Sequence, residues 1–148
     1  MSDTKDVLAS GEVIRERVVR IIRGMGHSLK EVEFYVYGTS TKEVGGESED
    51  LRHDGVRNLF MAVDLDIASA FGSRKAAALG GRVCGILLVL DKATDRWLEE
   101  MGLLRAKQID DMEGKIEYVF APAAAPEINR RGVWVYLPPD IFEQEEGS

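Results

Sequence analysis

The stretch that decides the fold runs from residue 59 to residue 91: LFMAVDLDIASAFGSRKAAALGGRVCGILLVLD. Leu59–Ile67 places its odd-numbered apolar residues on one face and its aspartates on the other, which is typical of a half-buried strand. Ser69–Leu79 is rich in alanine and ends at Gly80-Gly81, as a short helix does. Val83–Leu90 is apolar throughout, which predicts a strand covered on both faces. Together these segments predict a strand–helix–strand unit, or βαβ unit, at the centre of the fold.

A second interpretation of the same residues stays open. Gly72 and the alanines around it also fit one longer helix that begins near Asn58. Asp64 and Asp66 would then point to different faces, because side chains two residues apart do not share a helix face.

The chain on either side predicts further helices and strands. From the spacing of apolar residues we expect helices at Gly11–Met25 and Thr94–Leu104, and strands at Val32–Tyr37, Lys115–Phe120 and Gly132–Leu137. Ala121–Glu127 holds two prolines and predicts a stiff extended linker. The expected fold class is therefore α/β (or α+β): a single-domain sandwich with a mixed sheet of about five strands, the central βαβ unit, and helices packed on the sheet. The first three strands could be parallel and the last two an antiparallel edge pair.

Length and composition predict one ordered domain. We expect it to span residues 10–142, between a disordered N-terminus at residues 1–9 and an acidic disordered tail at residues 143–148. The chain carries 26 acidic and 19 basic side chains, a net charge of −7. This charge argues against broad binding to nucleic acid, which needs a basic surface.

The cysteine content and the lack of any segment for export or membrane insertion predict the cellular compartment. Cys84, the single cysteine, lies in the most apolar run, so we expect a small buried side chain and no disulfide within the chain. The N-terminus lacks the apolar core of a signal peptide, and the longest apolar run is too short to span a bilayer. We therefore expect a cytoplasmic protein that does not enter a membrane.

Three aspartates predict a metal site. Asp64 and Asp66 stand two apart on the predicted strand, so both carboxylates would project to one side, and Asp91 at the end of the next strand could join them. Carboxylates on one rigid face can hold Mg²⁺ or Mn²⁺, which would be the cofactor of such a site. The simpler interpretation is that Asp64 and Asp66 form the solvent side of an amphipathic strand.

One pair of short motifs resembles a known family. Gly38-Thr39-Ser40, followed by Asp64-Leu65-Asp66, is similar to the motif of the polymerase-β-like nucleotidyltransferases, and the similarity covers residues 34–67. The two parts stand farther apart here than in that family, and no helix is predicted between them. The resemblance implies nucleotidyl transfer with Asp64 and Asp66 as metal ligands.

A second candidate site binds anions. Ser73, Arg74 and Lys75 follow a small, glycine-containing turn that we expect to open a helix. The start of a helix exposes N–H groups, and the two cations add positive charge, so these residues could hold a phosphate or carboxylate. An ordinary strand-to-helix turn with two surface cations fits equally well.

The predicted last strand offers an interface. Trp134 and Tyr136 share one of its faces, and exposed aromatic residues there would suit a homodimer surface. One interpretation requires no departure from the spacing of a known motif. It is that the chain is a non-catalytic ligand-binding, regulatory or adaptor protein, which acts as a homo-oligomer on a small-molecule or protein ligand. The alternative is a divalent-metal-dependent phosphoryl or nucleotidyl transfer enzyme that uses Asp64 and Asp66.

Overall fold

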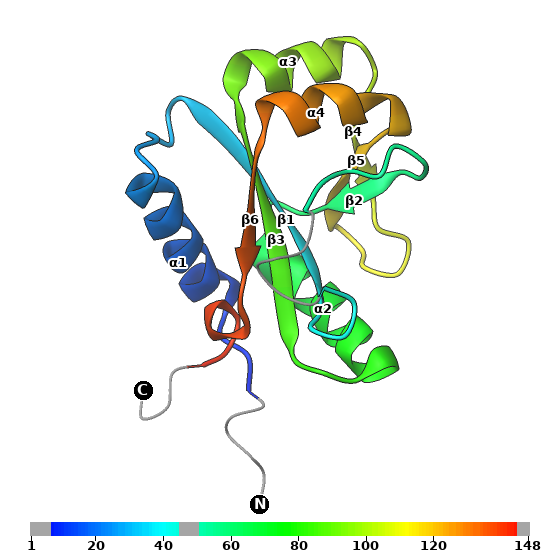
Figure 1. Cartoon of the computed structure of the whole chain (residues 1–148). Coiled ribbons are helices and arrows are strands. Elements are labelled where there is room, and N and C mark those ends of the chain that lie inside the picture. The colour runs from blue at the N-terminus through cyan, green and yellow to red at the C-terminus, as the bar shows by residue number, and fades with distance from the viewer. Residues whose placement is uncertain (1–6, 45–50, 145–148) are drawn as a thin grey trace, which may run out of the picture.

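The computed structural model of the chain describes residues 7–44 and 51–144 (Figure 1). Its helices are α1 (Gly11–Gly24), α2 (Leu65–Leu79), α3 (Lys92–Glu100) and α4 (Ala125–Arg131). Its strands are β1 (Val32–Ser40), β2 (Leu59–Met61), β3 (Val83–Asp91), β4 (Leu104–Gln108), β5 (Ile116–Phe120) and β6 (Val133–Leu137). The part of the chain that is described is thus a mixed α/β fold with two small sheets, in the orders β1-β3-β6 and β2-β5-β4.

β3 is the central strand of the first sheet. It pairs with β1 from Val32↔Asp91 to Ser40↔Val83, and with β6 from Gly85↔Leu137 to Val89↔Val133. Its residues are buried along almost the whole strand, which confirms the prediction of a strand covered on both faces. Every pair of named strands is antiparallel, so the expectation that the first three strands are parallel is wrong.

α1 and α2 cover one face of this sheet. Ile14, Val18 and Ile22 of α1 are fully buried there, in one core with Leu87 of β3. The approach of α2 to β1 depends on a glycine: a Cβ atom added to Gly38 would lie 1.8 Å from the carbonyl oxygen of Ala68. Only a residue without a side chain lets the helix and strand pack this closely.

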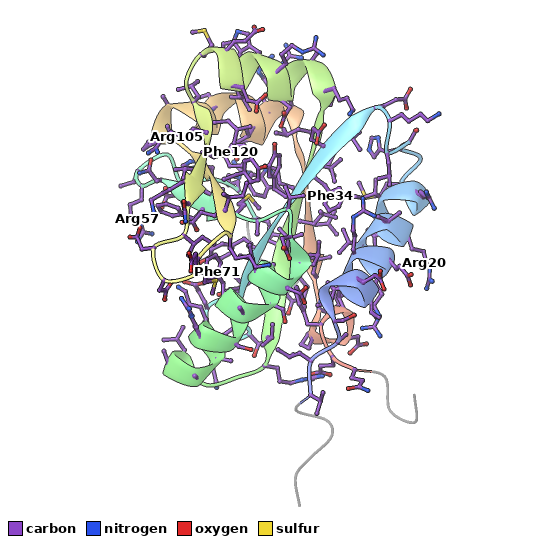
Figure 2. All side chains as sticks on the ribbon, turned by 180° about the vertical axis from the view of Figure 1, so that it is seen from behind. Arg20, Phe34, Arg57, Phe71, Arg105 and Phe120 are labelled. Atoms are coloured by element: carbon purple, nitrogen blue, oxygen red, sulfur yellow. The ribbon has the colours of Figure 1, made fainter. Side chains whose placement is uncertain are left out.

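The second sheet covers the other face, together with α3 and α4, which lie side by side at one end of the molecule (Figures 1 and 2). The ring of Tyr35 meets the rings of Tyr118 and Phe120 edge-on, with centroids 5.5 and 5.1 Å apart. An isolated bridge, Val36↔Ala62, joins the two sheets through the chain that follows β2. The protein therefore has a second core, between the sheets, in addition to the one under α1 and α2.

The central βαβ unit is not confirmed, because β2 and β3 belong to different sheets. Only Leu59–Met61 of the predicted first strand is a strand, and α2 begins at Leu65, ahead of the predicted start at Ser69. The cause is Asp64, whose side chain accepts the N–H of Asp66 at 2.9 Å and so caps the helix. The strand at β2 also excludes the longer helix from Asn58.

Two elements, α4 and β4, lie in segments where the sequence does not predict them. α4 begins inside the expected linker Ala121–Glu127 and continues beyond it. Pro122 starts a short 3₁₀ helix, Pro122–Ala124, and Pro126 stands in the first turn of α4, where a missing N–H costs nothing. β4 forms where α3 is expected to end, since α3 stops at Glu100 and Gly102 turns the chain with φ of 73°.

The described ends of the chain pair with each other. Leu8 bridges to Glu143, and the N–H groups of Ala9 and Gln144 donate to Phe142 and Val7 at 2.9 and 3.0 Å. The remaining parts of the predicted disordered segments, residues 1–6 and 145–148, lie outside the described residues. Among the helices that are described, none has the length and apolar character needed to cross a bilayer.

Candidate functional site

Two cavities adjoin at Tyr37, Phe60 and Lys75, which line both of them. The larger one, called the polar cavity, has a volume of about 750 Å³ and is also lined by Glu43, Arg52, His53, Asp54, Val56, Arg57, Asn58, Leu59, Ile86, Pro122 and Trp134. The smaller one, called the apolar cavity, has a volume of about 520 Å³ and is also lined by Gly38, Phe71, Arg74, Ala78, Lys107, Ile109, Asp110, Asp111 and Glu117. Both volumes are typical of small-molecule sites.

A hydrogen-bonded cluster separates the two cavities. The carboxylate of Glu43 accepts the Tyr37 hydroxyl at 2.9 Å, the Lys75 ammonium at 3.0 Å and the Thr39 hydroxyl. Partial burial opposes ionisation of Glu43, but these three donors outweigh it and hold the pKa of the carboxyl below its usual value. The bond to Glu43 raises the pKa of Lys75, and burial raises the pKa of Tyr37. The cluster is therefore a fixed ion pair with two hydroxyl donors.

Aromatic side chains from two elements face the apolar cavity. Phe60 of β2 is 39% exposed, and Phe71 of α2 is half-buried. Figure 2 shows Phe71 on the side of α2 that faces the loop after β4. Arg74 lies over the Phe71 ring at 5.9 Å and pairs with Asp111 of that loop at 3.0 Å. The cavity thus has an apolar interior and a charged rim.

Glu117 brings a carboxyl group into the apolar cavity. The residue is 8% exposed, and its carboxyl accepts no hydrogen bond from any residue that the structure describes. The Lys107 ammonium, 3.9 Å from Oε2, is beyond hydrogen-bonding distance. Burial raises the pKa of Glu117, and Lys107 opposes this rise only in part. The Glu117 oxygens are not among the fully buried polar atoms, so they remain open to a partner that enters the cavity.

His53 in the wall of the polar cavity has a structural role. The N–H of Gly55 donates to Nδ1 at 2.9 Å, which leaves Nε2 to donate to the Phe120 carbonyl at 3.1 Å. Asn129 of α4 bonds both the N–H and the carbonyl of His53 at 2.9 Å. Because both ring nitrogens are occupied, His53 anchors its loop to β5 and α4.

The three aspartates of the predicted metal site each accept hydrogen bonds from N–H groups at the start of a helix. Asp64 caps α2, and Asp91 caps α3 by accepting the Thr94 N–H and hydroxyl at 2.8 Å. Asp66 accepts the N–H of Gly11, the first residue of α1, at 2.7 Å. Within residues 7–44 and 51–144, no group of three or more His, Cys, Asp or Glu side chains is placed to hold a metal ion. Binding of Mg²⁺ or Mn²⁺ here stays a prediction.

The predicted anion-binding residues lie inside α2 and not at its start. The expectation that Ser73, Arg74 and Lys75 follow a turn at the start of a helix is wrong, because α2 already begins at Leu65 and these three residues lie within it. Their N–H groups belong to helical turns, and the two cations pair with Asp111 and Glu43. The structure thus places these cations on the rims of the two cavities.

The predicted interface residues lie on the edge strand β6. Trp134 is half-buried, lines the polar cavity and packs against the second core. Its Nε1 atom is buried and finds no acceptor in the described part of the chain. Tyr136 is half-buried as well, and it hydrogen-bonds the thiol of Cys84, whose pKa burial raises. A homo-oligomer through these two residues stays a prediction.

Sequence patterns do not predict the apolar cavity. Phe60 and Glu117 approach it from strands whose partners the sequence does not reveal, and the packing of Phe71 against them depends on the same unknown pairing. One signal was available: Glu117 is the acidic member of an otherwise apolar and aromatic strand, Ile116–Phe120.

The motifs that resemble the nucleotidyltransferases do not form a free catalytic group. The Ser40 hydroxyl donates to the Gly80 carbonyl at 2.5 Å, the Thr39 hydroxyl donates to Glu43, and Asp64 and Asp66 cap helices. No protein-family model, no curated protein and no solved structure matches the chain.

Proposed function

We propose that this protein binds a small, largely apolar organic ligand in the apolar cavity and does not transform it. The observation that carries the proposal is an open cavity of about 520 Å³ between α2 and the second sheet, with Phe60, Phe71 and Ile109 in its walls. Ligand sites in proteins are typically apolar clefts of this size with a few placed polar groups. Burying an aromatic ligand there would remove apolar surface from water, which is the main source of affinity in such sites.

Tyr37, Lys75 and Cys84 support binding over catalysis. A general base must lose its proton near neutral pH, but burial and Glu43 keep Tyr37 protonated and the bond to Glu43 keeps Lys75 charged. A nucleophilic cysteine needs a lowered pKa, whereas burial raises that of Cys84.

The test measures binding of a neutral aromatic probe, 2-phenylethanol, by isothermal titration calorimetry. Ala78→Phe should abolish binding, because Ala78 is an exposed residue of α2 that lines the apolar cavity. Ala77→Phe is the matched control, since Ala77 is exposed on the same helix and lines neither cavity. Equal binding by both variants would contradict the proposal, as would no binding by the unchanged protein.

Homo-oligomerisation is a further part of the proposal. β6 is an edge strand of the first sheet, and Val133 is 41% exposed on it. Exposed apolar edge strands are a common route to pairing between chains. Trp134 and Tyr136 on the same strand would then lie close to the interface.

A further inference from the structure

We infer that the ligand of the apolar cavity is an organic cation, an amine carried on an aromatic or apolar group, whose ammonium donates to the carboxyl of Glu117. This inference rests on the proposed function and adds the chemical class of the ligand. Its basis is the carboxyl itself: Glu117 is 8% exposed, lines a cavity with apolar walls, and accepts no hydrogen bond within the described chain. A hydrogen-bond donor from the ligand would complete it.

The charges around the cavity favour a cation. Arg74 is matched by Asp111 at 3.0 Å, and Lys75 by Glu43 at 3.0 Å. The charges that remain on the lining are those of Glu117, Asp110 and Lys107, with the Lys107 ammonium 3.9 Å from both carboxylates. The lining itself holds three bases and three acids, but Lys75 is neutralised by Glu43, which lines only the polar cavity. Two acids and one base therefore remain near the Glu117 carboxyl, so a positively charged donor fits better than an anion.

The walls define the rest of the ligand. Phe60 and Phe71 offer aromatic faces and edges, against which a ring packs better than a polar group does. The two rim ion pairs stand at the charged border of the cavity and leave its interior apolar. A ring joined to an ammonium by a short chain would place the ring between the phenylalanines and the ammonium at Glu117.

The experiment compares three probes of similar size by titration calorimetry: 2-phenylethylamine (cation), 2-phenylethanol (neutral) and 3-phenylpropanoate (anion). The expected result is that the amine binds roughly tenfold more tightly than the alcohol, and the anion most weakly. In Glu117→Gln the preference for the amine should disappear while the alcohol binds as before. Asp110→Asn is the matched control, because it removes the same charge from a side chain that is 97% exposed and should keep most of the preference.

Several outcomes would overturn the inference. They are equal binding of amine and alcohol, tighter binding of the anion, and an equal loss of preference in Asp110→Asn and Glu117→Gln. Binding of the alcohol in any of these cases leaves the proposed function standing. If none of the three probes binds, the proposed function fails together with the inference. The comparison of probes on the unchanged protein decides the matter even if a variant does not fold.

Discussion

At the scale of single residues, Glu117 is the clearest case of a side chain kept at a cost to stability. The residue is only 8% exposed, so its carboxyl loses most of its contact with water on folding, a cost that an apolar side chain would not have. Residues of this kind are commonly retained for a site, because folding alone gives no reason to keep them.

Glu117→Gln should therefore raise stability with a distinctive pH dependence. Burial raises the pKa of Glu117 in the folded state, so its contribution to stability is full at acid pH and is lost as the pH rises through that raised pKa. The variant lacks this loss. Its advantage in unfolding free energy, measured by urea denaturation, should grow from near zero at about pH 4 to about 1 kcal/mol at pH 7. A difference that does not change with pH would contradict this prediction.

Asp66 ties two helices together. Its carboxylate accepts the N–H of Gly11, so α2 caps α1 from a distant part of the sequence. Asp66→Ala should lower the free energy of unfolding by about 1 kcal/mol, because a helix cap is lost. Asp66→Asn keeps an acceptor oxygen and should cost less. If denaturation shows equal losses for both variants, the hydrogen bond is not the cause.

For Trp134 we expect a substitution that does not lower stability, in contrast to Asp66→Ala. Its buried Nε1 has no acceptor in the described residues, and an unsatisfied buried donor is unfavourable. Trp134→Phe removes this donor and retains an aromatic ring, so the melting temperature should stay within about 2 °C of the original or rise. A fall of more than this would show that the indole makes a favourable interaction.

At the scale of elements, the contact between β1 and α2 is the most demanding in the fold. Gly38→Ala would place a Cβ atom 1.8 Å from the carbonyl oxygen of Ala68, so helix and strand must separate. We expect a loss of at least about 3 kcal/mol in unfolding free energy. Gly24→Ala is the control, because nothing lies within 4 Å of an added Cβ there, and it should be nearly neutral. A tolerated Gly38→Ala would contradict the packing described.

Elements with a strong local pattern could be predicted from the sequence. The apolar stripe of α1 and the capping residue Ser10 define that helix, and the apolar run of β3 defines the central strand. The early start of α2 and the helix α4 could not be predicted, because they depend on capping by Asp64 and on prolines that begin helices. Strand pairing could not be predicted either, because no local sequence pattern shows that β3 lies between β1 and β6. The candidate site depends on that pairing, so the sequence predicts only single members of it, such as Lys75.

At the scale of the whole molecule, the described fold is built from two three-stranded sheets and two hydrophobic cores. The first sheet is covered on one face by α1 and α2, and on the other by the second sheet, α3 and α4. Both cavities lie where the second sheet meets β1, and the apolar one also borders α2. Cavities where several elements meet are common places for ligand sites.

The oligomeric state is tested at this scale. If β6 pairs between copies, sedimentation velocity should show a mass that rises with protein concentration. Val133→Lys should shift the distribution toward the single chain, because a charge on an exposed edge position opposes pairing. Phe60→Lys, at a position of similar exposure on β2, should not. A mass of one chain at every concentration would contradict the proposal of a homo-oligomer.

The place of β6 in the sheet has a consequence for synthesis on the ribosome. β1 and β3 can pair once residue 91 has left the exit tunnel. The other edge of β3 remains unpaired until residues 133–137 have also left it. During that interval one of the most apolar strands of the chain has an open edge, and such edges recruit other chains. Codons that slow translation between residues 91 and 133 should therefore increase the nascent chain's demand for chaperones.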